Sequence, residues 1–121
     1  MPSVLIDESE LNYNQPEAFK EMNEISKVSD ITYQDVAEYL RLYEIDNDDI
    51  NTLNTLINVA KTFASNYTGR TVEELDNYKD FVIVVFVLCQ DMWDNRTMYV
   101  DSTNINNLVQ SILGLHSVNL L

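Results

Sequence analysis

The longest apolar run of the sequence is Phe81-Val82-Ile83-Val84-Val85-Phe86-Val87-Leu88-Cys89. Five of its nine residues are β-branched, which favours a strand. The polar residues that flank the run, however, fall largely on one side of a helix drawn through 77–95. No comparable strand-like run occurs elsewhere in the chain to pair with it. We therefore expect a buried central helix at about residues 77–95.

The segment before this run predicts an amphipathic helix at about 48–67. Asp46 to Asp49 provide caps and negative charge at its start, and Gly69 provides a residue that can adopt the left-handed conformation at its end. Apolar residues recur every three or four positions between them: Ile50, Leu53, Ile57, Ala60, Ala64 and Tyr67. We expect this helix to pack on the central one, with these side chains mostly buried: Leu53, Ile57, Ala60, Phe81, Val85, Leu88 and Trp93.

Shorter helices are expected on either side of this pair. Thr32, with Asp35 three residues later, predicts the start of a helix at about 32–43. The stretch Thr71–Glu74 has the pattern of a capping box and predicts a short helical turn.

A last helix is expected at about 105–114, capped by Asn104 and ended by Gly114. Its apolar face would hold Ile105, Leu108, Val109, Ile112 and Leu113. The predicted fold class is therefore all-α, a small bundle of about four helices around a buried central helix. The scarcity of glycine and proline also argues against a β-sandwich or barrel.

The two ends of the chain differ from this core. Residues 1–29 are acidic, with sparse apolar residues, and we interpret them as an arm that is mobile or ordered by a partner. The helical domain would cover 30–115. Residues 116–121 would form a C-terminal tail that is unusually apolar.

The composition bounds the function. The chain has 121 residues and a formal net charge of −13, which argues against binding to nucleic acid or to an anionic membrane, because phosphates are held mainly by Lys and Arg. The single cysteine excludes an intramolecular disulfide and a cysteine-based zinc site. A membrane-spanning helix needs about 20 apolar residues, more than the longest run contains. We expect neither nucleic-acid recognition nor a membrane association.

The sequence offers little chemistry. A calcium loop that began at Asp46 would need glycine and glutamate where the chain has Asn51 and Ile57. The only histidine, His116, has no nucleophile motif around it, and Cys89 ends the apolar run as a buried thiol would. We therefore expect no enzymatic activity, no metal and no cofactor.

Three stretches follow one another in an order that a known family shares. The first is Ile31–Arg41, and the second is Asp48–Arg70, which ends on Tyr67-Thr68-Gly69-Arg70. The third is Val84–Arg96, which ends on Trp93-Asp94-Asn95-Arg96. Together they resemble the three helices of the head–tail connector family (adaptor or head-completion proteins) of long-tailed double-stranded DNA bacteriophages.

This resemblance implies a structural virion protein. Members of the family form a ring beneath the portal of the filled capsid, extend the DNA channel and offer a docking surface for the tail. The implied partners are the portal protein, a tail or stopper protein and further copies of the chain. The implied location is the head–tail interface of the virion, with assembly in the host cytoplasm. A strongly negative subunit suits a channel that passes DNA without binding it.

Two sets of residues are candidates for contacts in such a ring. Because few bases compete for many acids, we expect ion pairs between subunits at Arg41, Arg70 and Arg96. The apolar tail could dock on the portal or a neighbouring subunit, or fold back on its own domain. Its candidate contact residues are Leu115, Val118, Leu120 and Leu121.

Other functions remain as alternatives. The net charge would suit an acidic inhibitor that mimics DNA and blocks a host nuclease or regulator. Its acids, however, cluster at helix starts and in the arm, and the second helix has a neutral Asn/Thr face. A further helical interaction module, or a small enzyme, would be compatible with the same length.

Overall fold

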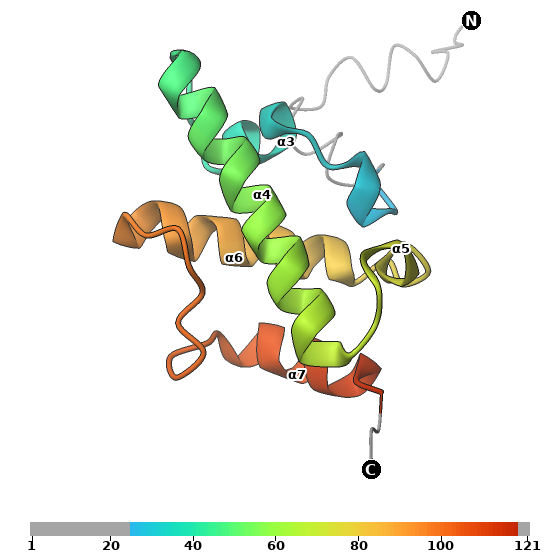
Figure 1. Cartoon of the computed structure of the whole chain (residues 1–121). Helices are drawn as coiled ribbons and strands as arrows, with labels where there is room; N and C mark the ends of the chain where they lie inside the picture. Colours follow the sequence, from blue (N-terminus) through green and yellow to red (C-terminus); the bar gives the residue numbers. More distant parts are fainter. Residues whose placement is uncertain (1–24, 119–121) are drawn as a thin grey trace, which may run out of the picture.

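The computed structural model describes residues 25–118, and within this range every regular element is helical (Figure 1). The expected all-α class is therefore confirmed. The elements in chain order are a short 3-10 helix η1 (Val28–Asp30), α3 (Tyr33–Tyr39), α4 (Asn47–Thr68), α5 (Val72–Leu75), α6 (Phe81–Asn95) and α7 (Asn107–His116).

Helix α6 is the centre of the fold and contains the apolar run. It packs against η1, α3, α4 and α7, so it is covered on most sides (Figure 1). Within the run only Ile83 is exposed, and it lies on the same side of the helix as the exposed Gln90 just after the run. A helix that is apolar nearly all round must be buried, and this packing outweighs the strand preference of the β-branched residues. The central-helix prediction is confirmed, with a start at Phe81 rather than near residue 77.

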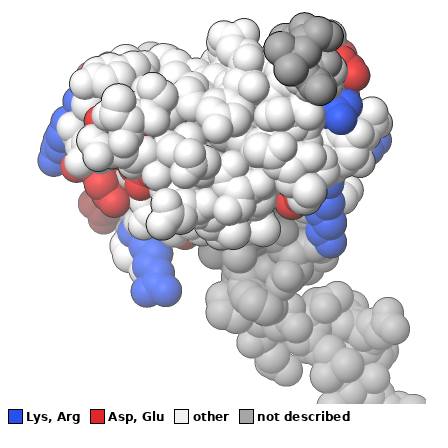
Figure 2. All heavy atoms as spheres, turned by 90° about the horizontal axis from the view of Figure 1, so that it is seen from below, with Lys and Arg blue, Asp and Glu red and all other residues white. Residues whose placement is uncertain are grey.

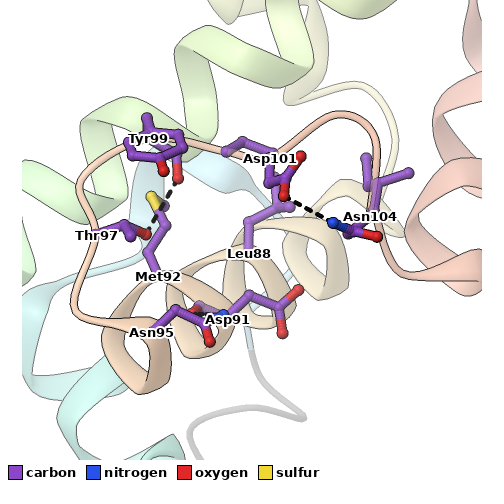
Figure 3. Close-up of a pocket in the computed structure, with 10 residues that line it drawn as sticks. Leu88, Asp91, Met92, Asn95, Thr97, Tyr99, Asp101 and Asn104 are labelled. Carbon is purple, nitrogen blue, oxygen red and sulfur yellow. Dashed lines mark hydrogen bonds between the residues drawn. The ribbon is translucent and has the colours of Figure 1, made fainter.

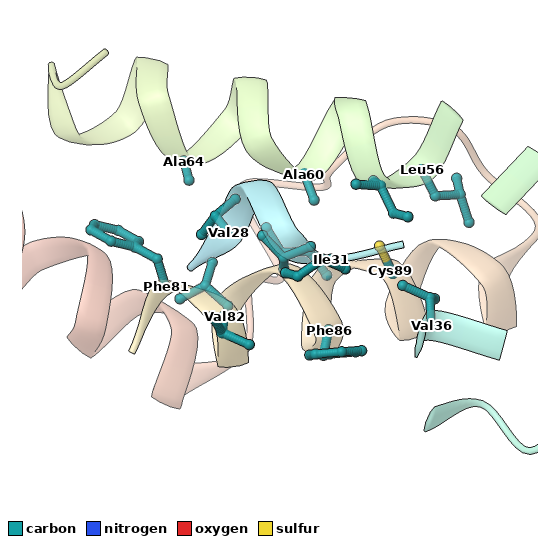
Figure 4. Packing of buried hydrophobic residues seen from close by; sticks show 14 of the residues in the cluster. Val28, Ile31, Val36, Leu56, Ala60, Ala64, Phe81, Val82, Phe86 and Cys89 are labelled. Atoms are coloured by element: carbon teal, nitrogen blue, oxygen red, sulfur yellow. The ribbon is translucent and has the colours of Figure 1, made fainter. Parts of the chain in front are cut away.

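Helix α4 crosses α6 and forms the other half of the core. Figure 4 shows Leu56, Ala60 and Ala64 directed from α4 toward α6. Ala60 and Ala64 are fully buried, and their small side chains let the two helices approach closely. The predicted burial is confirmed for six of the seven side chains: Leu53, Ile57, Ala60, Phe81, Val85 and Leu88.

Trp93 is the exception among the predicted core residues, because it is only half-buried. It lies in the last turns of α6, beside a pocket of about 290 Å³ that Asp49 and Thr52 of α4 also line. At this end α6 meets the polar first turns of α4, which leave part of the indole uncovered.

Three capping boxes begin helices where the sequence indicated them. The side chain of Thr32 accepts from the Asp35 backbone, and the Asp35 carboxylate accepts from the Thr32 backbone in return. Asp46 and Asp49 make the same reciprocal pair at the start of α4. The third box begins α5 at Thr71, as expected. Gly69, with a φ of 77°, ends α4 in the left-handed conformation, also as expected.

The helix expected at 32–43 ends earlier, at Tyr39. The reason is a left-handed turn at Arg41, whose φ is 60°. The backbone N–H of Leu42 then donates to the carbonyl of Ala37 at 2.9 Å, which closes the helix in a Schellman motif. The sequence has no glycine at this point to mark such an ending.

The last helix is shifted from its expected place. Asn106, rather than Asn104, caps it by accepting from the backbone of Leu108 at 2.8 Å, while the Asn104 side chain donates to Asp101 instead. Gly114 does not end the helix, which continues to His116. Leu108, expected on the apolar face, is 54% exposed.

The boundary expected at residue 29 also moves. Ile25 and Val28 are buried in the core, and the backbone N–H of Ser29 donates to Asp76 at 3.0 Å. The helical domain therefore includes residues from Ile25 onward, because these side chains cover α6. The rest of the predicted arm, 1–24, lies outside the described residues.

Candidate interaction surface

Two of the three candidate arginines lie at helix ends where the backbone is left-handed. Arg41 follows α3 and Arg96 follows α6, and both adopt the left-handed conformation, with φ values of 60° and 57°. After α6, the N–H of Thr97 donates to the carbonyl of Met92 at 2.9 Å, which repeats the Schellman motif of α3. Glycine is the usual residue at such positions. Both arginine side chains are exposed, so the structure leaves them available for partners.

The third candidate, Arg70, is already engaged within the chain. Its Nε atom donates to the backbone carbonyl of His116 at 2.7 Å. Its guanidinium lies 4.8 Å from the ring centroid of Tyr78 and 3.8 Å from a carboxylate oxygen of Glu74. Hydrogen bonds from Thr71, the backbone bond first, lower the pKa of the Glu74 carboxyl, which keeps this partner ionised. Arg70 therefore joins the α4–α5 connection to the end of α7.

His116 makes a second connection at the end of α7. Its Nε2 atom lies 2.9 and 3.1 Å from the two carboxylate oxygens of Asp80, just before α6. An ionised carboxylate only accepts, so Nε2 carries the proton and donates. The imidazole also packs against the rings of Tyr78 and Phe81, with centroid separations of 4.3 and 5.1 Å. We call Arg70, Tyr78, Asp80 and His116 the C-terminal clasp.

The clasp was missed by the sequence analysis, which placed His116 in a tail. No spacing motif joins residues so far apart in the chain. The backbone continues the attachment after the helix, because the N–H of Val118 donates to the carbonyl of Thr68 at 2.7 Å. The predicted tail is thus bound to its own domain as far as Val118. Leu120 and Leu121 lie outside the described residues.

The outer side of α7 is uncharged and includes exposed apolar side chains. Leu108 and Leu115 are 54% and 75% exposed, and Val118 beyond the helix is 40% exposed. The two leucines are seven residues apart, two helical turns, so they lie on one side of α7. We call Leu108, Leu115 and Val118 the α7 ridge. Seen from the α7 side, the surface is mostly free of charged residues (Figure 2).

The sequence explains this face. From Asn104 to Leu121 the chain contains no Asp, Glu, Lys or Arg, although its net charge is −13. The absence of charge is a signal that could have been found without the structure. The direction in which the leucines point could not, because it depends on where the helix begins.

A second uncharged feature lies on the side of α4. A groove of about 400 Å³ runs between this helix and the segment Met98–Val100. None of its lining residues is charged: Thr55, Asn58, Val59, Thr62, Phe63, Asn66, Met98, Tyr99 and Val100. Val59, Phe63 and Val100 are half-buried against the core, whereas Met98 and Tyr99 are 54% and 65% exposed. We call this feature the α4 groove.

A polar pocket of about 360 Å³ lies between the end of α6 and the loop before α7 (Figure 3). Asp91 and Asn95 face it from α6, and Asp101 and Asn104 from the loop. Burial, and then the charge of Asp94, raise the pKa of Asp91.

Asp101 in this pocket is already bonded within its loop. Its carboxylate accepts from the hydroxyl of Thr103 at 2.6 Å and from the amide of Asn104 at 2.9 Å. Hydrogen bonds to Thr103 and Asn104, the Thr103 side chain first, lower the pKa of Asp101. Within 25–118, no group of three or more His, Cys, Asp or Glu residues is arranged to hold a metal ion. The Asp101 carboxylate therefore serves to hold the loop before α7.

The thiol of Cys89 is buried and unreactive at neutral pH. Cys89 is fully buried in the centre of α6, and desolvation raises its pKa to about 12. It therefore stays protonated at neutral pH and does not supply a thiolate nucleophile. Among residues 25–118 no helix combines the length and apolarity that a membrane span needs.

Comparisons with known proteins found no relative of this chain. No protein-family model, no curated protein and no solved structure matches the chain. The functional argument therefore depends on the residues and geometry described above.

Proposed function

We propose that the chain is a structural subunit of the ring that connects head to tail at the portal vertex of a long-tailed double-stranded DNA bacteriophage. The observation that carries the proposal is the resemblance of Ile31–Arg41, Asp48–Arg70 and Val84–Arg96 to the family's helices. These stretches coincide with α3, α4 and α6 in order. The Gly69 and Arg96 endings of the second and third stretches fall at the ends of α4 and α6.

The charge distribution supports this role. A subunit with a net charge of −13 repels phosphates, which suits the wall of a channel through which DNA moves. The uncharged α7 ridge and α4 groove provide surfaces on which proteins can pack. The proposed partners are the portal protein, a tail or stopper protein and further copies of the chain. The proposed place is the virion, after assembly in the host cytoplasm.

The tail contributes to this proposal in a revised form. Leu115 and Val118 are exposed while the backbone beside them is held by the clasp and by Thr68. Their side chains are therefore presented to a partner on a fixed support, which lowers the entropic cost of binding. Leu120 and Leu121 remain candidate contacts by sequence alone.

The test is attachment to purified portal. The purified chain is mixed with portal rings from the same phage or prophage, and co-sedimentation and electron microscopy detect an added layer. We expect a regular ring on one face of the portal. A chain that never joins the portal would contradict the proposal.

Deletion of residues 119–121 separates docking from folding, because it leaves the clasp intact. If the tail docks on the portal, this truncation keeps its helical content but attaches more weakly. Deletion of 115–121 would be a poorer test, because it also removes His116 and weakens the attachment of α7. Inhibition of a nuclease by micromolar protein, with no portal attachment, would instead favour the DNA-mimic alternative.

A further inference from the structure

The α7 ridge and the α4 groove have one property in common. Neither contains a charged residue, although the chain carries twenty acidic and seven basic residues. Exposed apolar side chains on an otherwise highly charged surface mark a place where another protein packs. The question is which protein fits both features.

We propose that a second copy of this chain occupies the α4 groove, and that the copy inserts its α7 ridge there. This inference rests on the proposed ring-forming function, because a ring needs two unlike patches on each subunit. The groove is a shallow hollow in which Val59, Phe63 and Val100 are half-buried, whereas Leu108 and Leu115 are exposed on a helix. Two grooves cannot fill one another, but a ridge and a groove can.

The absence of charge favours a contact between these two surfaces. Two copies of net charge −13 repel each other wherever their acids come close. At physiological salt this repulsion is screened beyond about 8 Å, so a contact between uncharged patches is the least opposed. Salt should therefore strengthen the contact. Ion pairs through Arg41 or Arg96 would give a contact that salt weakens, and Arg70 is already held by the clasp.

Two substitutions test the patches separately. Leu108→Asp adds a charge to the ridge in the first turn of α7, where a carboxylate favours the helix, so the domain should remain folded. Thr62→Asp adds a charge to the groove at an exposed position of α4, with little change in helix propensity. Tyr43→Asp, at a residue 89% exposed in the α3–α4 loop, and Asn54→Asp, exposed on α4 outside the groove, are matched controls.

Sedimentation velocity over a range of protein and NaCl concentrations measures self-association. We expect the parent and both controls to associate with increasing concentration, and more strongly as NaCl rises. Leu108→Asp and Thr62→Asp should each weaken the association constant by at least about tenfold. Circular dichroism should give the same helical content for all four variants.

Mixing the two impaired variants completes the test. The Thr62→Asp chain keeps an intact ridge and the Leu108→Asp chain an intact groove, so a mixture should form heterodimers more strongly than either variant associates with itself. A chain that is monomeric at every concentration, association that salt weakens, or a mixture without heterodimers would each overturn the proposal. If Leu108→Asp and Thr62→Asp self-associate like the parent, the proposed contact is also overturned. If these variants still attach to the portal, the proposed connector function stands.

Discussion

The Nε2 atom of His116 lies 2.9 Å from a carboxylate oxygen of Asp80, so the last turn of α7 is bound to the residue that precedes α6. The histidine side chain is only 15% exposed, and its backbone carbonyl accepts from Arg70. The last helix is therefore attached at its end by polar contacts, in addition to the apolar contacts along its length.

Substitution of His116 should loosen this attachment. We expect His116→Ala to lower the free energy of unfolding by about 1–2 kcal/mol, because it removes a hydrogen bond to a charged group and the ring packing on Tyr78. Urea denaturation followed by circular dichroism measures the change. Leu115→Ala, at the adjacent and 75% exposed position, is the control and should change stability by less than about 0.5 kcal/mol. Equal effects of the two variants would show that the clasp contributes nothing specific.

Substitution of Val85 should disrupt the core. We expect Val85→Asp to cost at least about 3 kcal/mol, a large part of a domain's stability, because it places an unpaired carboxylate in a fully buried site of α6. Ile83→Asp is the matched control, since Ile83 is 45% exposed on the same helix and a charge there remains hydrated. Thermal unfolding measures both variants. A Val85→Asp protein that melts like the parent would disprove the burial of this helix.

The buried thiol should make stability depend on alkaline pH. Its pKa is raised from 9.0 to about 12 in the fold, so above pH 9 the unfolded chain loses a proton that the folded chain keeps. Stability must therefore fall as pH rises, by about 1.4 kcal/mol at pH 10 from this group alone. Denaturant unfolding at pH 8 and 10, for the parent and for Cys89→Ala, isolates the contribution. We expect a smaller loss in the variant, and no labelling of the folded parent by a thiol-reactive dye at pH 8.

Glycine in place of Arg96 should stabilise the domain. The residue has a φ of 57°, a conformation that costs a side-chain-bearing residue about 1 kcal/mol relative to glycine. We expect Arg96→Gly to raise the melting temperature by about 4 °C. Arg96→Ala removes the same side chain but keeps the strain, so it should bring no such gain. A destabilised glycine variant would mean that the arginine side chain makes contacts worth more than the strain.

Much of the fold followed from periodic patterns. The cores of α4 and α6 were predictable because apolar residues recur at helical spacing over many residues, and capping boxes marked the starts of α3, α4 and α5. The end of α3 was not predictable, since its left-handed residue is Arg41 and not glycine. The start of α7 was misplaced because several asparagines compete for the cap, and the side chain of Asn104 is used by Asp101.

The candidate interaction surface was harder to predict from the sequence than the fold. The apolar character of the C-terminal residues was visible, but its attachment to the domain was not. That attachment depends on His116 and Asp80, which only the packing of α7 against α6 brings together. The prediction of an ion pair between subunits at Arg70 did not anticipate its partners within the chain, for the same reason. Pairings between distant segments have no local pattern.

Charge is unevenly distributed over the described residues. Acidic residues gather at the start of α4, whereas the uncharged C-terminal segment is bonded to Thr68, the last residue of that helix. Beside a polyanion such as DNA, a region dense in carboxylates is repelled more strongly than an uncharged segment, so an uneven charge distribution rotates a molecule as well as repelling it. Its orientation is thereby biased by a long-range field before any side chain touches a partner.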